Sequence, residues 1–239
     1  MGTIERPRDG GGARGAVAVV VAARDEGERI AATLAALSEA FPGAALWVAD
    51  DGSRDRTAVI AGAAGAQVVS TGRRRGKGEA MSAAAQRALA AVPGGADDVF
   101  VLCDGDLGES AARLAPLAEP VIRGEADLAV AAFARREGGG LGLAVGFARW
   151  AIGRSSGVRM QAPISGQRSL NRATLETVMP LAAGFGMELA MTIDALGAGR
   201  RVAEVELDLS HRATGRTPAG FVHRGRQLLD FVRAYARRL

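Results

Sequence analysis

The stretch that decides the fold of this chain of 239 residues is Val99-Phe100-Val101-Leu102-Cys103-Asp104-Gly105-Asp106-Leu107. Its first part is short and apolar on both faces, which is typical of a buried parallel strand. Two carboxylates, Asp104 and Asp106, follow directly, at the end of the strand where α/β sheets hold their ligands. Because neighbouring carboxylates repel each other, the pair predicts a divalent cation that also carries a nucleotide diphosphate. A solvated Asp-Gly turn is the alternative interpretation.

Similar apolar runs alternate with Ala-rich helical segments through the first half of the chain. The pattern predicts strands at 16–23, 45–49, 67–70, 98–103, 126–133 and 201–207. It predicts helices at 28–41, from 56 onward, and at 78–91, 173–179, 188–196 and 219–239. This alternation indicates an α/β fold with a mostly parallel, Rossmann-like central sheet flanked by helices.

We expect one domain with a flexible, Gly/Arg-rich lead-in at 1–15, a nucleotide-binding half at 16–130 and a second half at 131–239. The lead-in lacks the apolar core of a signal peptide. The last helix is predicted to be amphipathic, with an apolar stripe of Phe221, Leu228, Val232, Tyr235 and Leu239. The arginines of this tail lie elsewhere on the helix, so that it could also contact an anionic membrane surface.

Composition narrows the class of partner. The net charge of +4 suits phosphorylated small molecules or an anionic membrane surface as readily as nucleic acid, but aromatic residues make up 4%, which argues against stacking on single strands. Cys103 is the single cysteine, which excludes an intrachain disulfide and fits a reducing compartment. No apolar run approaches the roughly 20 residues of a membrane span. We therefore expect a cytoplasmic protein without a nucleic-acid partner. Any contact with the membrane would be peripheral, at its inner face. A homodimer is compatible with the sequence.

Two polar turns follow the first two predicted strands. After the first come Ala22, Ala23, Arg24 and Glu26, where backbone groups and an acid could meet a base or a ribose. An acidic helix N-terminus explains Glu26 equally well. After the second comes the stretch 50–53, Asp-Asp-Gly-Ser, in which Asp50 or Asp51 could accept from a uracil-type base or from ribose hydroxyls. A helix cap is the alternative here, although other residues of the turn could supply it.

A third motif, Gly72-Arg73-Arg74-Arg75-Gly76-Lys77-Gly78-Glu79-Ala80, places cations among glycines just ahead of a helix. This arrangement is typical of an anion site. The spacing is one residue short of a Walker loop, and Gly78 stands where Ser or Thr is required. A solvated basic loop is the alternative.

The fourth motif is the pair Asp104 and Asp106 with Gly105 between them, to which His211 could add a distant ligand. His211 follows a predicted strand and lies in a polar loop, although a lone histidine is more often structural. Carboxylate and imidazole ligands together suit Mg²⁺ or Mn²⁺, with diphosphate oxygens completing the shell.

The order of these four motifs resembles that of the GT-A glycosyltransferases of family 2, over residues 17–216. Within that family the chain is similar to the glucosyl-3-phosphoglycerate synthases, through Gly76–Ala80 and through Gly184-Phe185-Gly186-Met187-Glu188. It departs from them at Phe185, where they have tyrosine. It also departs at Gly139-Gly140-Leu141-Gly142-Leu143, where their acceptor motif Gly-Arg-Val-Thr has no match.

The resemblance implies a role for each matching residue. Asp51 would hold the uracil, Lys77 the diphosphate, and Asp106 with His211 the metal. Glu188 would face the donor sugar or the acceptor. If the transfer inverts the configuration of the sugar, Glu188 is our candidate for the base that deprotonates the acceptor hydroxyl. If the transfer retains the configuration, the sequence offers no obvious nucleophile. With Ala22, Ala23, Arg24, Glu26, Asp50, Asp104 and Gly105, these residues form the predicted nucleotide-sugar site. Residues 16–130 then become the nucleotide-sugar half and 131–239 the acceptor half.

The functional hypothesis is a metal-dependent transfer of a hexosyl group from a nucleoside diphosphate sugar, with uridine as the expected base, to a small phosphorylated or polyprenyl phosphate acceptor. Gln167 and Arg168 are candidate acceptor contacts at the predicted opening of a helix; a glycine-assisted turn is the alternative. A sugar-nucleotide pyrophosphorylase is a rival enzyme, although it needs a Gly-rich loop after the first strand, where this chain has none. A basic module that binds membrane or nucleic acid without catalysis is a further rival.

Overall fold

The computed structural model describes residues 15–133, 143–208 and 228–238. A central sheet has the strand order β3-β2-β1-β4-β6-β5-β7. The strands are β1 Val17–Ala23, β2 Ala45–Asp50, β3 Gln67–Ser70, β4 Val99–Asp104, β5 Leu128–Phe133, β6 Arg168–Asn171 and β7 Val202–Leu207. All pairings are parallel except those of β6, which runs antiparallel to both β4 and β5. The predicted mostly parallel α/β fold is therefore confirmed.

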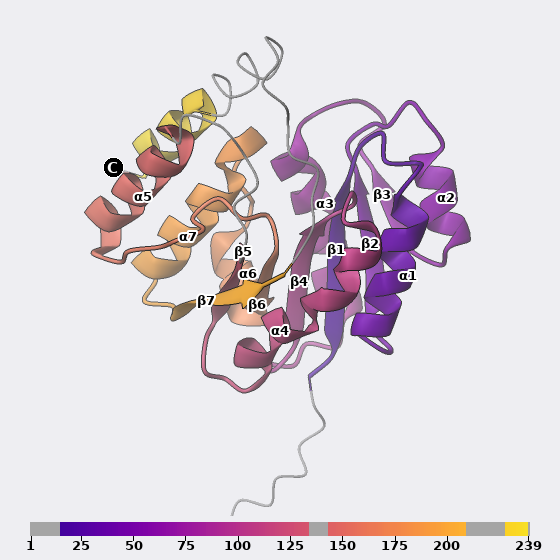
Figure 1. Ribbon diagram of the computed structural model, residues 1–239, viewed down its shortest axis with the longest axis horizontal. Coiled ribbons are helices and arrows are strands. Elements are labelled where there is room, and N and C mark those ends of the chain that lie inside the picture. Colours follow the sequence, from indigo (N-terminus) through magenta and orange to yellow (C-terminus); the bar gives the residue numbers. More distant parts are fainter. Residues whose placement is uncertain (1–14, 134–142, 209–227, 239) are drawn as a thin grey trace, which may run out of the picture.

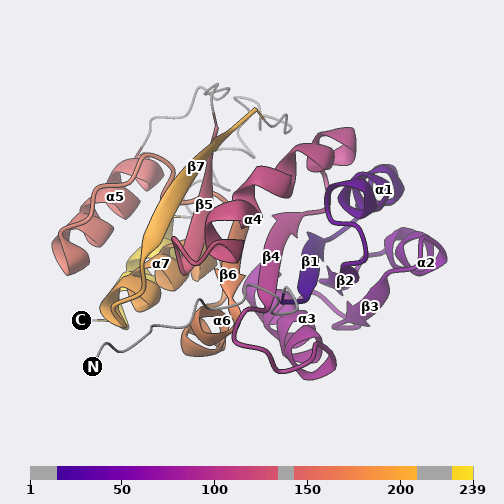
Figure 2. The same ribbon diagram turned by 90° about the horizontal axis from the view of Figure 1, so that it is seen from below.

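Helices cover both faces of this sheet, as Figures 1 and 2 show. The α-helices are α1 Ile30–Ala40, α2 Thr57–Ala63, α3 Lys77–Ala91, α4 Ala115–Ile122, α5 Leu143–Ser156, α6 Arg172–Val178 and α7 Met187–Gly197. Two 3₁₀ helices, η1 Gly108–Leu114 and η2 Gly184–Gly186, lead into α4 and α7. Strands and helices thus alternate as the apolar pattern predicts, with ends that differ by one or two residues.

The alternation of side chains along each strand divides the core in two. In β1, Ala18 and Val20 face a core that includes α3, α5, α6 and α7, while Val19 and Val21 face α1, η1 and α4. All four side chains are fully buried. Burial on both faces explains why the central strands are continuous apolar runs rather than alternating ones.

Three parts of the prediction need correction or addition. The sequence pattern did not predict α4, α5 or η1. The helix expected to open at Gln167 and Arg168 is wrong, because a turn at Ser165 leads into strand β6 instead. The sequence of β6, Arg-Ser-Leu-Asn, carries no strand pattern. This segment forms a strand because it pairs with the apolar strands β4 and β5 on either side.

The end of the chain is helical at 228–236 within the described residues. The predicted apolar stripe is wrong in part: Val232 is 43% exposed, whereas Phe231, Ala234 and Tyr235 are buried. Tyr235 packs against the rings of Phe147 and Trp150 on α5, with centroid distances of 6.0 and 5.4 Å. The segment therefore packs against helix α5 and, through the contact of Arg238 with Asp194, against helix α7.

Some predictions fall outside the described residues, namely those on the lead-in, on the glycine run at 138–142 and on His211. Among the helices of the described ranges, none combines the length and the apolar character that crossing a bilayer requires.

Candidate active site

A cleft of about 900 Å³ opens at the carboxyl ends of β1, β2 and β4. Most of the predicted nucleotide-sugar residues line it: Ala22, Ala23, Arg24, Glu26, Asp51, Lys77, Asp104, Gly105 and Asp106. They come from four separate segments, at the ends of β1, β2 and β4 and at the start of α3, which the parallel strands bring to one edge of the sheet. The structure thus gathers the predicted residues in a single place.

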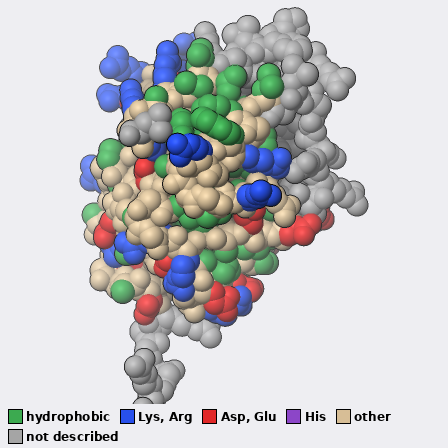
Figure 3. Space-filling view, turned by 90° about the vertical axis from the view of Figure 1, so that its left-hand side faces the viewer, with side chains coloured by type: hydrophobic (Ala, Val, Ile, Leu, Met, Phe, Trp, Pro, Cys, Tyr) green, Lys and Arg blue, Asp and Glu red, His purple; other side chains and the backbone are tan. Residues whose placement is uncertain are grey.

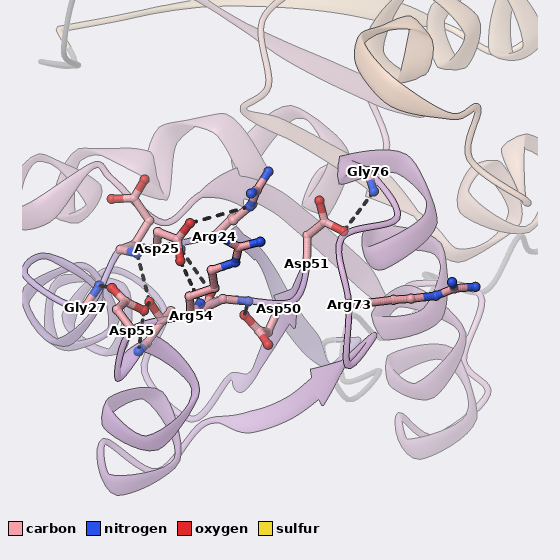
Figure 4. A network of polar contacts seen from close by, with 12 residues as sticks. Arg24, Asp25, Gly27, Asp50, Asp51, Arg54, Asp55, Arg73 and Gly76 are labelled. Carbon is pink, nitrogen blue, oxygen red and sulfur yellow. Dashed lines mark hydrogen bonds and ion pairs between the residues drawn. The ribbon is translucent and has the colours of Figure 1, made fainter.

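The Asp-Asp-Gly-Ser turn after β2 divides its two carboxylates between different tasks. Asp50 is buried and accepts hydrogen bonds from the Ser53 backbone N–H at 3.1 Å and from the Ser70 hydroxyl at 2.6 Å. Asp51 lines the cleft, and its Oδ1 accepts from the backbone N–H groups of Arg75 at 2.6 Å and Gly76 at 2.8 Å. Asp50 therefore braces the turn, while Asp51 joins the cleft to the basic loop ahead of α3 (Figure 4).

The loop after β1 is tied to the same turn. The backbone N–H of Asp25 donates to the Ser53 hydroxyl at 3.0 Å, and Asp25 Oδ1 accepts from the Arg54 N–H at 2.8 Å. Beside this loop, burial and then the charge of Asp106 raise the pKa of Glu26. Glu26 and Asp106 therefore share a region of negative potential, which favours a cation.

Lys77 is the centre of an ionic network. Its Nζ lies 2.6 Å from Asp104 Oδ1 and 2.9 Å from Glu188 Oε1, and it thereby joins α3, β4 and α7. Burial lowers the pKa of the Lys77 ammonium, but the charges of Asp104 and Glu188 outweigh burial, and the net shift is upward. Lys77 is therefore charged at every physiological pH.

A glycine and a glutamine complete this network. The Gln167 Nε2 donates to Asp104 Oδ2 at 2.9 Å. A Cβ on Gly166 would lie 2.6 Å from that same oxygen and 2.9 Å from Lys77 Nζ, so that no larger residue fits there without a shift. Gln167 thus fixes the carboxylate of Asp104 without itself lining the cleft, a role that the sequence did not predict.

The Asp-Gly-Asp segment supplies oxygen ligands of the kind that Mg²⁺ and Mn²⁺ prefer. The backbone of Gly105 is fixed by its N–H to the Ala22 carbonyl at 2.8 Å and by its carbonyl oxygen, which accepts from the Thr33 hydroxyl at 2.8 Å. Asp104 and Asp106 flank it and both line the cleft. Within the described ranges no group of three or more His, Cys, Asp or Glu comes together around one point. The segment therefore places carboxylate oxygens, of the kind that these cations take as ligands, at the edge of the cleft.

Four of the predicted residues within the described ranges are not among those that line the cleft, namely Asp50, Gln167, Arg168 and Glu188. Arg168 is fully buried, and its guanidinium donates to the carbonyls of Ser165 and Pro163 and to the Thr192 hydroxyl, at 2.8–3.1 Å. Burial lowers the pKa of Arg168 to about 10, so that it stays charged at neutral pH. Glu188, 6% exposed, reaches the site through Lys77.

Sequence reasoning missed one side of the cleft. Phe185 with Gly184 in η2, and three residues of the C-terminal segment, Leu229, Asp230 and Arg233, also line it. Asp230 is the single acid from residue 211 onward, among many arginines. This isolated acidic residue is the feature of the sequence that could have indicated that the C-terminal segment belongs to the site.

The fold and the cleft together define an α/β protein with a polar cleft at the carboxyl ends of its parallel strands, lined by several carboxylates. The chain belongs to glycosyl transferase family 2, whose family model matches residues 18–163. This finding confirms the family resemblance, and it favours the glycosyltransferase hypothesis over the pyrophosphorylase alternative.

Several characterised relatives are similar over most of the chain. Glucosyl-3-phosphoglycerate synthase from Mycolicibacterium paratuberculosis is 34% identical over 82% of this chain and 65% of its own length. The Mycobacterium tuberculosis enzyme of that name is 31% identical, over 84% and 67%. The chain thus spans about two thirds of the length of these relatives.

Solved structures agree with this relationship. The M. tuberculosis enzyme in complex with Mn²⁺, uridine-diphosphate-glucose and phosphoglyceric acid superposes with a TM-score of 0.72, at 29% identity, over 93% of this chain and 80% of that one. Its complex with Mn²⁺, uridine diphosphate and glucosyl-3-phosphoglycerate superposes with a TM-score of 0.71, at 29% identity, over 98% and 86%. The GT-A fold is therefore confirmed.

Proposed function

We propose that this protein transfers a hexosyl group from a uridine diphosphate sugar to a small phosphorylated acceptor. The observation that carries the proposal is the convergence of Asp51, Lys77, Asp104 and Asp106 on one cleft. The similar M. tuberculosis structures that hold uridine-diphosphate-glucose and phosphoglyceric acid support these two compounds as the first donor and acceptor to test.

Each end of the donor has a matching group in the cleft. Asp51 has its carboxylate held by two backbone N–H groups through one oxygen, and we assign it to the uracil or the ribose. Arg74 and Arg75 border the cleft beside it and are exposed, so that their charges are free to contact an anionic ligand. Lys77 is assigned to the neighbourhood of the diphosphate.

Asp106 would hold Mn²⁺ or Mg²⁺, with His211 as the proposed distant ligand. When bound, such a cation supplies positive charge beside the departing diphosphate. The chain's own contribution is a rigid carboxylate frame: Gln167 and Lys77 hold Asp104, and the backbone of Gly105 is fixed on both sides. A frame that needs no reorganisation during the reaction is effective electrostatic catalysis.

Glu188 is the proposed base for the acceptor hydroxyl in an inverting transfer. Its carboxylate is held in the ion pair with Lys77 at 2.9 Å, so that its position depends on the same lysine that faces the diphosphate. Gln167 is retained as a candidate near the acceptor. Arg168 is not, because its three buried hydrogen bonds favour a structural role.

One surface observation favours a second acceptor class, the polyprenyl phosphates. Exposed apolar side chains gather on the face formed by α5 and the C-terminal segment, with arginines among them (Figure 3). They are Leu143, Trp150, Leu229 and Val232. Leu229 also lines the cleft, so that the apolar tail of an acceptor bound in the cleft could lie on this face.

The test is a donor and acceptor screen with Mn²⁺, using uridine-, guanosine- and thymidine-diphosphate sugars against phosphoglyceric acid and a short polyprenyl phosphate. Product masses report the transfer. Asp106→Ala is expected to lower the transfer rate at least 100-fold. Asp97→Ala is the matched control, because Asp97 is exposed and lies just before β4, at the opposite end of that strand. A wild-type chain that transfers no sugar from any donor, or an Asp106→Ala variant as active as the control, would refute the proposal.

A further inference from the structure

The C-terminal segment, residues 228–238, contributes one side of the cleft. Its residues Leu229, Asp230 and Arg233 line the cleft together with Phe185 of η2. The segment is anchored by the burial of Phe231 and Tyr235 and by Arg238, which donates to both carboxylate oxygens of Asp194 on α7, at 2.6 and 2.5 Å. It is therefore a packed part of the domain, in direct contact with the helix that carries Glu188.

The contact between this segment and η2 is close. The backbone N–H of Phe185 donates to Asp230 Oδ2 at 3.2 Å. Gly184 has a φ of +63°, and a Cβ there would collide with the same carboxylate oxygen. At Gly186, a Cβ would lie 2.7 Å from the Ala234 Cβ and 2.9 Å from the Asp230 carbonyl oxygen. The two glycines thus let the helix approach until its carboxylate meets the backbone of the turn.

This turn leads directly into the ionic network of Lys77, Asp104 and Glu188. Gly186 is the residue before α7, and Glu188 lies in the first turn of that helix. Glu188 Oε1 is 2.9 Å from Lys77 Nζ, which is itself 2.6 Å from Asp104. A shift of the backbone at Phe185 therefore moves the start of α7 and, with it, the carboxylate that Lys77 contacts.

We infer that Asp230 is a positioning residue for the reaction: by accepting from the Phe185 N–H it fixes the Gly184–Gly186 turn and so sets the position of Glu188 against Lys77. The expected loss of rate rests on the proposed function. The expected fixing of the Gly184–Gly186 turn rests on the geometry alone. Displacement of a reacting group by about 1 Å costs roughly 100-fold in rate, so that a loss of 10- to 100-fold is expected when this acceptor is removed.

The experiment compares Asp230→Ala, Asp230→Asn and the control Arg237→Ala, which removes an exposed cation from the same segment. Asp230→Ala is expected to lower kcat 10- to 100-fold, with the Kd for uridine diphosphate within twofold of wild type, because the nucleotide residues lie on other loops. Asp230→Asn is expected to stay within threefold of wild type, since its amide oxygen can accept the same hydrogen bond. Arg237→Ala should match wild type.

Hydrogen–deuterium exchange of the peptide 184–190 gives a readout that does not need activity. Exchange there should become faster in Asp230→Ala and stay unchanged in Asp230→Asn and Arg237→Ala, even if the protein proves to have another substrate. The inference is overturned if Asp230→Ala leaves both exchange and kcat unchanged, or if Asp230→Asn is as impaired as Asp230→Ala. A wild-type chain without transferase activity but with the expected exchange pattern would refute the proposed function and leave the positioning role in place.

Discussion

Replacement of Lys77 by methionine should destabilise the protein through the two carboxylates that it leaves behind. In the folded chain Lys77 Nζ lies 2.6 Å from Asp104 Oδ1 and 2.9 Å from Glu188 Oε1. With an effective dielectric constant of about 20, each attraction amounts to roughly 6 kcal/mol before the cost of desolvation. Most of this gain is offset on folding, because all three groups leave water.

The net effect follows from the burial of the partners. Loss of one member of a buried ion pair costs about 3–5 kcal/mol. The Glu188 side chain is 8% exposed, but that of Asp104 is 33% exposed, so that water screens part of the loss. We expect Lys77→Met to lower the free energy of unfolding by about 2–3 kcal/mol.

The assay is urea denaturation of Lys77→Met, Glu188→Gln and the double variant. In the double-mutant cycle the coupling between Lys77 and Glu188 should be about 1–3 kcal/mol, because the two groups are in direct contact. The raised pKa of Lys77 means that its contribution is complete at neutral pH and is lost only as the pH rises through that raised pKa. The destabilisation should therefore be the same at pH 7 and pH 9.

A surface ion pair provides the control for this cycle. Arg123 contacts Glu119 and Glu125, but all three side chains are more than half exposed, so that Arg123→Met should leave stability nearly unchanged. A Lys77–Glu188 coupling below about 0.5 kcal/mol, as for independent sites, would contradict the reasoning.

Three further predictions concern other parts of the site. Gly166→Ala should lower the free energy of unfolding by about 1–3 kcal/mol in urea denaturation, since its Cβ would meet Asp104 and Lys77; Gly146→Ala, where nothing lies within 4 Å, should not be destabilising. Arg168→Met should lower it by at least about 2 kcal/mol, because the Thr192 hydroxyl and two carbonyls lose their donor in the core; a smaller loss would show that these groups find other partners. Cys103 should react with a thiol reagent at neutral pH in urea but not in the native protein, since burial raises the pKa of its thiol; rapid native labelling would contradict this.

The sequence by itself determined the strands of the sheet other than β6, and it determined the place of the site. The apolar runs of β1 and β4 follow from local pattern, because a strand buried on both faces must be apolar throughout. The edge strand Gln67–Ser70 follows from its place in the alternation of strands and helices. The strand-end rule then brought Asp51, Lys77 and Asp106 to one edge of the sheet, and all three line the cleft. The strands and the turns that follow them depend on residues close together in the chain, so that the local sequence is sufficient to predict them.

The tertiary structure alone decided which groups touch. Lys77 meets Glu188 across 111 positions of sequence, and Phe185 meets Asp230 across 45. Arg168 is buried in β6, although its own segment resembles a polar turn. Such contacts arise where distant elements pack. A local pattern of polar and apolar residues therefore predicts neither the partner that a buried side chain meets nor, in the case of Arg168, the burial itself.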